Sequence, residues 1–311
     1  MLVVSGEALF DVYRVADTPW GVSLDARIGG SPLNVAVGLA RLAQPVAFFG
    51  ALARGGLGTR LRQALQAEGV DTVCSVDLDA PPTLSLVDVA PDGGPSYVFY
   101  GHGGADRRLP LSALALVPAA QACTFGSYTM VVEPVASTLR ALVERECARS
   151  LIAYDPNIRL NVEPDLQRWR EVLGWMLPRT HLLKISDEDL HALYPGTDPA
   201  LLVPQWLAAG VRLVVLTRGG QGATAWTATG HVSVPGRPVQ VVDTVGAGDT
   251  FQAALLTALA ERDLLSPQGL GALGASTLRE VLGFACHAAA LTCSRRGADL
   301  PRRTELPPAP P

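Results

Sequence analysis

Short apolar runs alternate along the chain with segments in which apolar residues recur at helical spacing. The apolar runs lie at 45–50, 150–155, 181–185 and 211–217, and helical patterns cover 31–43, 57–68, 133–147 and 165–176. Buried strands that alternate with amphipathic helices are typical of βαβ units, in which helices cover both faces of a parallel sheet. The pattern therefore predicts an α/β protein with a mainly parallel central sheet.

Residues 10–28 and 83–100 show a different pattern. In the second of these segments, the alternating stretches "LSLVDV" (84–89) and "SYVFY" (96–100) flank the turn signal "APDGGP" (90–95). Strands joined by such turns pair in antiparallel fashion. We expect a small antiparallel β lid that stands off the main sheet and is formed by about 10–28 and 83–106.

Two further helices, at 247–260 and 276–293, are predicted near the end of the chain. No internal repeat and no interdomain linker interrupts the sequence. With 311 residues, of which 48% are hydrophobic and 17% charged, the chain can bury one large core. We therefore expect residues 1–311 to form a single domain.

Charge and hydropathy narrow the range of partners. The formal net charge is −4, and the arginines are scattered rather than gathered into a basic stripe, so we expect small-molecule partners and no nucleic acid. No apolar run reaches the roughly 18 residues that a membrane span requires, and the N-terminus lacks the basic start of a signal peptide. The sequence thus predicts a soluble cytoplasmic protein that does not bind membranes.

Cysteine, histidine and lysine usage excludes several kinds of site. The five cysteines include no CxxC pair, and the five histidines show no HExxH spacing, which argues against a disulfide framework or a dedicated zinc site. Lys184 is the only lysine, against 24 arginines, and no glycine-rich run precedes it. A Walker-type phosphate loop needs such a run before its lysine, so this kind of site is excluded.

The stretch "DTVGAGDTFQAALL" (243–256) places small residues before an acidic one at the expected start of a helix. It follows "VQVVDT" (239–244), which is predicted to be a strand. Free amides at a helix N-terminus bind anions, and Gly246, Ala247 and Gly248 would let a phosphate approach the backbone. The Asp249 carboxylate would disfavour a site that only binds an anion. It would suit phosphoryl transfer if it accepts the proton of the attacking hydroxyl. A glycine turn with an Asp favoured by the helix dipole is the alternative interpretation.

The full spacing of this stretch resembles the C-terminal signature of the PfkB, or ribokinase-like, carbohydrate kinases. A second stretch, "GGSPLNVAVGLARL" (29–42), is similar to the N-terminal signature of the same family. Within the family the chain looks most like bacterial fructokinases, through "GEALFD" (6–11), "GSYTMVVEP" (126–134) and "DPNIR" (155–159). The resemblance implies a three-layer α/β/α sandwich and ATP-dependent phosphorylation of a primary alcohol of a sugar, with Mg²⁺.

The resemblance also implies roles for individual residues. Asp249 matches the catalytic base; Gly246, Ala247 and Gly248 match the anion hole; and Arg159 matches a residue near the phosphates or the sugar. The remaining matches are sugar contacts at Asp11, Gly29, Gly30 and Asn34, nucleotide contacts at Lys184, Ser186, Thr217, Gly219 and Gly222, and metal contacts at Glu188 and Asp189. The resemblance implies two further properties more weakly. One is activation by K⁺ through carbonyl groups around Asp243 and Val245, and the other is a homodimer formed through the lid.

Some positions depart from the family pattern. Ser186 and Asp189 stand where the family often shows Asn-x-x-Glu, which leaves the metal contact open. Ala53, Arg54 and Gly55 replace a usual Gly-Asp-Asp. Gly101 stands where relatives often carry Arg, which leaves the preferred sugar open.

The sequence supports three interpretations of function. A fructokinase is the first, with other PfkB sugar or sugar-acid kinases, acting on ribose or 2-keto-3-deoxygluconate, as alternatives in the same class. A non-catalytic sugar or nucleotide sensor on the kinase fold is the second. A nicotinamide dehydrogenase is the third, and the missing dinucleotide fingerprint in the first βα turn argues against it.

Overall fold

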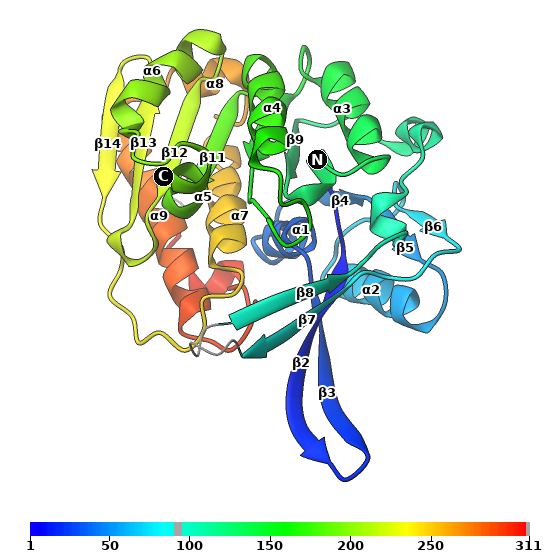
Figure 1. Ribbon diagram of the computed structural model, residues 1–311. Helices are drawn as coiled ribbons and strands as arrows, with labels where there is room; N and C mark the ends of the chain where they lie inside the picture. Colours follow the sequence, from blue (N-terminus) through cyan, green and yellow to red (C-terminus); the bar gives the residue numbers. More distant parts are fainter. Residues whose placement is uncertain (90–94, 309–311) are drawn as a thin grey trace.

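The computed structural model describes the backbone of residues 1–89 and 95–308 and, apart from 88–89 and 95–97, their side chains. An eight-stranded sheet forms the centre of the molecule, with strand order β14-β13-β12-β11-β10-β9-β1-β4 (Figure 1). The run from β4 to β12 is parallel throughout, and β13 and β14 are added as antiparallel strands at one edge. The predicted mainly parallel sheet is therefore confirmed.

The strands of this sheet are β1 (Leu2–Ser5), β4 (Val46–Phe49), β9 (Ala122–Gly126), β10 (Leu151–Asp155), β11 (Leu182–Ser186), β12 (Leu213–Thr217), β13 (Ala223–Thr227) and β14 (Gly230–Val234). The α-helices are α1 (Ser31–Arg41), α2 (Gly56–Ala67), α3 (Val135–Glu146), α4 (Leu166–Met176), α5 (Asp187–Leu193), α6 (Pro199–Ala209), α7 (Ala247–Ala260), α8 (Pro267–Gly271) and α9 (Ala275–Cys293).

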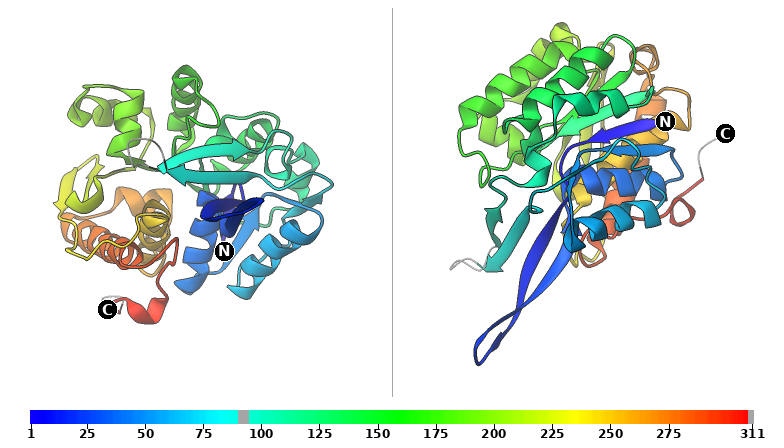
Figure 2. Two further views of the ribbon diagram at one scale, coloured as in Figure 1. Left: turned by 60° about the horizontal axis from the view of Figure 1, so that its bottom comes forward. Right: turned by 90° about the vertical axis from the view of Figure 1, so that its right-hand side faces the viewer.

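Helices cover both faces of the central sheet, as alternation along β1 illustrates. Leu2 and Val4 join one hydrophobic core, formed with α1, α2, α7 and α9, whereas Val3 points into a second core formed with α3, α4, α5 and α6. Successive side chains of a strand point to opposite faces, so a continuously apolar strand packs against helices on both sides. Figure 2 shows the resulting three layers, and the predicted α/β/α sandwich is confirmed.

The lid is a separate four-stranded sheet of order β3-β2-β7-β8, made of β2 (Leu9–Thr18), β3 (Gly21–Gly29), β7 (Leu84–Val89) and β8 (Pro95–Tyr100). Both hairpins are antiparallel, as expected, but β2 and β7 pair in parallel where the hairpins meet. Most of the predicted turn at 90–95 lies outside the described residues. The β2–β3 hairpin projects from the body of the molecule (Figure 2).

Two predicted segments differ from their expected structure. Residues 101–106, assigned to the lid, follow the end of β8 and lead into a 3₁₀ turn at Ala105–Arg107. The apolar stretch 239–244 forms no strand, because Val241 and Val242 are 61% and 59% exposed and pair with no neighbouring strand. That prediction was wrong, since apolar composition alone does not supply a partner strand.

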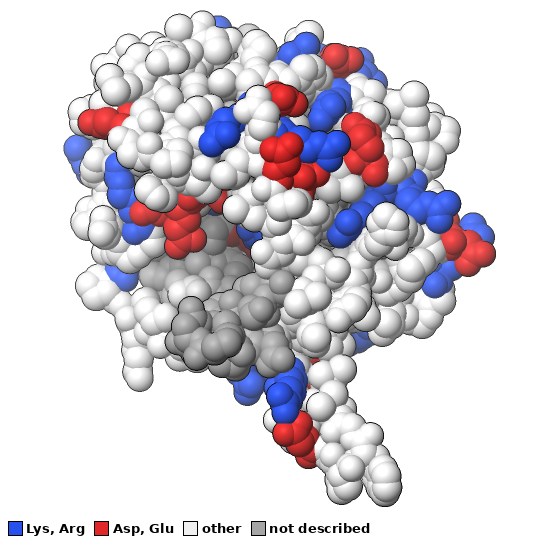
Figure 3. All heavy atoms as spheres, viewed as in Figure 1, with Lys and Arg blue, Asp and Glu red and all other residues white. Residues whose placement is uncertain are grey.

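Helix boundaries follow the apolar periodicity closely: the helix predicted at 247–260 is α7, and that predicted at 276–293 begins one residue earlier as α9. No helix among the described residues is long and apolar enough to cross a bilayer. Acidic and basic side chains are interspersed on the face shown in Figure 3.

Candidate active site

The predicted site residues gather at one edge of the central sheet. The parallel strands β1, β9, β10, β11 and β12 all end there, and β10 and β12 end at Asp155 and Thr217. In open α/β sheets, ligands bind outside the carboxyl ends of the strands. Ser186 pairs directly with Thr217, so the predicted nucleotide contacts at these two positions lie side by side.

The anion-binding loop is a tight turn that leads into α7. Gly246 adopts a left-handed conformation with φ of 78°, which favours glycine, and a Cβ there would lie 2.7 Å from the Cβ of Ala298. Thr250 donates its hydroxyl to the Gly246 carbonyl at 2.8 Å and fixes the turn. In the first turn of α7 the Gly248 amide lacks an intrahelical acceptor because of its position, whereas the Ala247 amide donates to the Thr244 carbonyl at 3.2 Å. The structure therefore places these residues at a helix start, where the sequence predicts an anion-binding site.

Asp249 is held by side chains from α1. Its Oδ1 accepts a hydrogen bond from Ser31 Oγ at 2.6 Å, and its Oδ2 accepts one from Asn34 Nδ2 at 2.8 Å. Asn157, which follows β10, donates in turn to the Ser31 hydroxyl. Because Asp249 is only 9% exposed and bonded at both oxygens, its orientation is fixed before any ligand arrives.

Burial raises the pKa of Asp249 above its ordinary value, while hydrogen bonds from Ser31 and Asn34 and the charges of Arg159 and Lys184 oppose that rise. A carboxylate with a raised pKa is a better proton acceptor than one in water. The environment of Asp249 thus suits a general base.

Arg159 lies among the carboxylates of the site. Burial raises the pKa values of Asp11, Asp189 and Asp249, and the positive charge of Arg159 opposes each rise. For Asp189, burial raises the pKa to about 6. Three predicted carboxylates, from three distant parts of the sequence, are therefore within electrostatic range of Arg159.

Gly29 is the last residue of β3, and Gly30 joins it to α1. The carboxylate of Asp11 occupies the space that a Cβ at Gly29 would take. Gly30 has φ of 106°, and a Cβ there would lie 2.9 Å from the carbonyl oxygen of Glu7. Both glycines let the backbone pass close to the polar groups of the site.

Lys184 forms a buried ion pair with Asp155, with 2.7 Å between Nζ and Oδ2. Burial acts to lower the pKa of Lys184, but the adjacent Asp155 carboxylate outweighs it and the pKa is raised. Nζ also lies 3.2 Å from the position that a Cβ at Gly248 would occupy. The only lysine of the chain thus places a positive charge behind the anion-binding loop.

The predicted metal contacts lie in the first turn of α5. Ser186 caps this helix by accepting from the Asp189 amide at 3.0 Å, and Asp189 Oδ1 accepts from the Ile158 amide at 3.1 Å. Glu188 is exposed. Within the described residues no three His, Cys, Asp or Glu side chains cluster as a metal site. The donor set fits a Mg²⁺ ion that one or two carboxylates, water and nucleotide phosphates hold together.

The predicted nucleotide loop follows β12. Gly222, with φ of 94°, lies so close to the backbone of Val234 and Gly236 that a Cβ has no room, whereas a Cβ at Gly219 would meet nothing within 4 Å. Both glycines have a positive φ, since that of Gly219 is 47°, but only at Gly222, which joins β12 to β13, does the surrounding backbone also exclude a side chain. The exposed stretch 239–244, which is not the predicted strand, leads from this region to the anion-binding loop.

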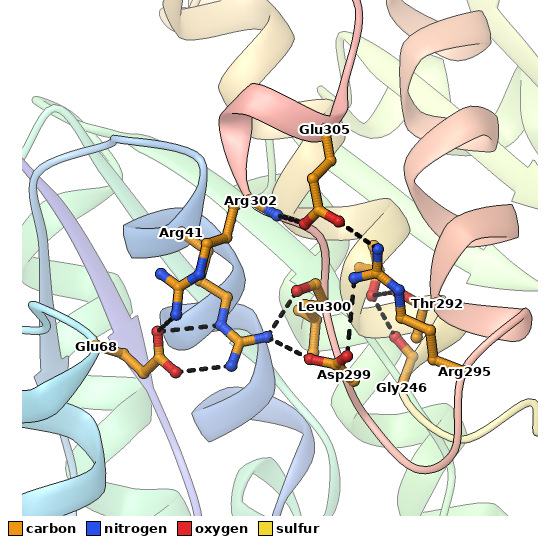
Figure 4. Close-up of polar contacts among 10 residues, drawn as sticks. Arg41, Glu68, Gly246, Thr292, Arg295, Asp299, Leu300, Arg302 and Glu305 are labelled. Carbon is orange, nitrogen blue, oxygen red and sulfur yellow. Dashed lines mark hydrogen bonds and ion pairs between the residues drawn. The ribbon is translucent and has the colours of Figure 1, made fainter.

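The C-terminal segment supports the anion-binding loop from behind (Figure 4). Arg41 at the end of α1 forms an ion pair with Glu68, at 2.6 Å, and with Asp299, at 2.9 Å. Leu300 fills the space beside Gly38 of α1, and Ala298 packs against Gly246. This segment thus ties together α1 and α7, the two helices that carry Asn34 and Asp249.

Several residues of the site carried no predicted role. Ser31, Asn157 and Asp155 lie within the quoted stretches "GGSPLNVAVGLARL" and "DPNIR", so their chemistry was visible. The bonds of Ser31 to Asp249, of Asn157 to Ser31 and of Lys184 to Asp155 arise only in the fold. Glu7 is 2% exposed, and burial raises its pKa to about 7.

At position 101, where Gly101 replaces the arginine that relatives often carry, another arginine lies close by. Arg107 Nη2 is 2.8 Å from the position that a Cβ of Gly101 would occupy.

A buried, hydrogen-bonded carboxylate at a helix start, with charged side chains around it at the carboxyl edge of the sheet and no Walker loop, is typical of a small-molecule phosphotransferase. The chain belongs to the pfkB family of carbohydrate kinases, whose family model matches residues 1–305. It is a sugar phosphotransferase of this family.

Individual relatives agree with this assignment. The chain is 35% identical to a fructokinase of Rhizobium leguminosarum bv. trifolii over 280 residues, which cover 90% of this chain and 86% of the relative. A fructokinase from Xylella fastidiosa with bound ATP superposes with a TM-score of 0.83 at 26% identity, covering 98% of this chain and 94% of that one. A fructokinase from Vibrio cholerae O395 with fructose, ADP and calcium gives 0.79 at 27% identity, covering 96% and 94%.

Proposed function

We propose that this protein is an ATP-dependent fructokinase that transfers the γ-phosphoryl group to a primary hydroxyl of the sugar, O6 of fructose. The observation that carries the proposal is the pre-oriented Asp249 carboxylate at the anion-binding start of α7. The similarity to fructokinases, one of them with fructose and ADP bound, supports the choice of sugar.

In this proposal Asp249 accepts the proton of the attacking hydroxyl. The amides of Gly246, Ala247 and Gly248 stabilise the charge that develops on the transferred group, and Arg159 and Lys184 add positive charge on the same side. Such preorganised donors are effective because they need no rearrangement during the reaction. Removal of the proton makes the hydroxyl oxygen a better nucleophile as the new bond to phosphorus forms.

Sugar and nucleotide bind from opposite sides of Asp249 in this account. Asp11 and Asn34, with the backbone at Gly29 and Gly30, provide acceptors and a donor for sugar hydroxyls. Ser186, Thr217, Gly219 and Gly222 bind the nucleotide. Glu188 or Asp189 would hold Mg²⁺, which would neutralise charge on ATP when bound, so excess EDTA should abolish turnover.

A monovalent cation, a homodimer and a cytoplasmic location complete the proposal. Asp243 accepts from the amides of Val245, at 3.1 Å, and Gly297, at 2.8 Å, and so folds carbonyl groups into a compact turn that could bind K⁺. Four exposed apolar side chains on the β2–β3 hairpin, where Trp20 is fully exposed, support dimerisation through the lid; the others are Val15, Val22 and Leu24. The free cysteines, three of them buried, are compatible with the reducing cytoplasm.

The test is kcat/KM for D-fructose, D-ribose, 2-keto-3-deoxygluconate and adenosine at the same ATP and Mg²⁺ concentrations. We expect fructose to exceed the other three, because a site that bonds several hydroxyls discriminates against analogues that leave its polar groups unpaired, by as much as about 10⁴. A tenfold preference for another acceptor would refute the fructokinase proposal and leave the sugar-kinase assignment intact. A preference for the sugar acid would point to the Arg107 guanidinium near Gly101.

A further inference from the structure

A small cavity lies between α1, α7 and the ends of β1, β9 and β10. It offers about 20 Å³ to the centre of a water molecule, and its polar lining residues are Ser5, Ser31, Thr124, Asp155 and Gln252. A polar cavity needs roughly 10–15 Å³ on this measure to hold one water. The cavity is therefore large enough for a single water molecule.

Four polar atoms of these lining residues form no hydrogen bond with any part of the chain that the structure describes: Ser5 Oγ, Asp155 Oδ1, and both Oε1 and Nε2 of Gln252. Gln252 is only 1% exposed, so bulk solvent does not reach its amide. Leaving a buried primary amide without partners is strongly unfavourable. A polar partner inside the cavity is the arrangement that satisfies it.

The polar groups that line the cavity can hydrogen-bond to a water molecule. Asp155 Oδ1 and Gln252 Oε1 are acceptors, whereas Gln252 Nε2 and the Ser5 hydroxyl can donate. A water molecule both donates and accepts, so it can bridge the Gln252 amide to a group across the cavity. The Ser31 hydroxyl donates to Asp249 and accepts from Asn157, and its oxygen can accept one further bond.

We propose that a buried water in this cavity bridges Gln252 to Asp155 and Ser31, and that Gln252 is a positioning residue for Asp249. Gln252 lies three residues after Asp249 on α7, so both side chains occupy the same side of the helix. The water joins α7 to α1 and to the end of β10. The positioning role rests on the proposed kinase function, whereas the water site itself does not.

The kinetic test is Gln252→Leu, which keeps the side-chain size and removes the amide. We expect kcat to fall about tenfold, because small errors in the placement of a catalytic group have large effects on rate, while KM for fructose and ATP stays within about twofold. Ser31 would hold the Asp249 carboxylate less firmly, so the pKa of Asp249 would rise and the acid limb of the kcat–pH profile would move to higher pH.

Thr257→Val is the matched control. Thr257 lies on the same helix, is fully buried, and its hydroxyl also has no partner among the described residues, but it does not line the cavity. We expect this variant to keep the wild-type kcat and pH profile. Equal losses in the two variants, or an unchanged pH profile in Gln252→Leu, would overturn the positioning role, provided that thermal melts show both variants folded.

A high-resolution crystal structure tests the water directly. We expect one ordered water within hydrogen-bonding distance of the Gln252 amide in the wild type, and none in Gln252→Leu. An empty cavity in the wild type would overturn the proposal. A wild type that binds this water but phosphorylates no sugar would remove the proposed function and the positioning role, and would leave the water site standing.

Discussion

The residues around Asp249 and those of the β2–β3 hairpin are held in opposite ways. Asp249 lies at a helix start in the core and is bonded at both carboxylate oxygens by Ser31 and Asn34. The hairpin projects from the body and exposes Trp20 completely and Leu24 by half (Figure 2). The chemistry of phosphoryl transfer is therefore built into the core, whereas the proposed contacts with a second chain would be made by the projecting hairpin.

The comparison also separates two kinds of sequence change. A change in the core should alter the rate of the chemical step and leave assembly intact. A change at the hairpin should alter assembly and leave that step intact. The predictions below test this division from the largest expected effect to the smallest.

Asp249→Asn should have the largest effect. Loss of a general base typically costs about 10²–10⁴ in kcat, and since the amide keeps the size of the carboxylate, the affinity for fructose should change little. Steady-state kinetics and calorimetric titration with fructose measure the two quantities. Asp263→Asn, an exposed position just beyond α7, is the control and should behave as wild type. Near-normal turnover of folded Asp249→Asn would show that another group is the base.

Glu7→Gln tests whether a buried acid between β1 of the core and β2 of the lid makes stability depend on pH. Burial raises the pKa of Glu7 from 4.5 to about 7, so the folded protein binds a proton that the unfolded chain has released between these pH values. The free energy of unfolding should therefore fall as pH rises through this window, by up to about 3 kcal/mol from this group. Urea unfolding at pH 4.5 and pH 8 should show a smaller loss in the glutamine variant.

Glu68→Gln provides a control of opposite sign for this experiment. The hydrogen bond and charge of Arg41 lower the pKa of Glu68, so its contribution is present at neutral pH and is lost only as pH falls below 4.5. The glutamine variant at this position should therefore retain the wild-type loss of stability between pH 4.5 and pH 8. If Glu7→Gln shows the same pH dependence as the wild type, Glu7 is not a buried acid with a raised pKa.

Trp20→Ser should have the smallest effect on catalysis and a clear effect on assembly. We expect the wild type to sediment at twice the 32.6 kDa of the chain and the variant to shift towards one chain, with kcat within about twofold. Leu201→Ser is the control, because Leu201 is 64% exposed on α6, outside the lid. A wild type that sediments as a monomer at micromolar concentration would refute dimerisation through the hairpin.

The same division explains what could be predicted from the sequence. Apolar periodicity located α7 and α9 almost to the residue, and the glycine spacing at 246–248 marked the tight turn that leads into α7. These are local signals, in which the residues that form the element also specify it. The parallel pairing of β2 with β7 and the irregular stretch 239–244 depend on partners far away in the sequence, and periodicity carries no information about them.

The candidate site shows a similar limit. Asp249, Asn34, Asp11 and Arg159 were predicted from their motifs, and the structure brings them together. The ion pair of Lys184 with Asp155 was not predicted, although both residues lay in quoted stretches, because it requires adjacent strands in register. The cavity beside Gln252 has no sequence signal, since it is defined by the space that five segments leave between them.

The most direct test of the central claim is the product formed when the wild type is incubated with ATP, Mg²⁺ and fructose. Phosphorus NMR, with ADP measured in the same sample, should show one fructose 6-phosphate for each ADP in the wild type and almost none in Asp249→Asn. Fructose binding without ADP formation would instead identify a sensor, and ADP without a sugar phosphate would identify hydrolysis. Either result would contradict the account of Asp249 as the base in phosphoryl transfer to a sugar.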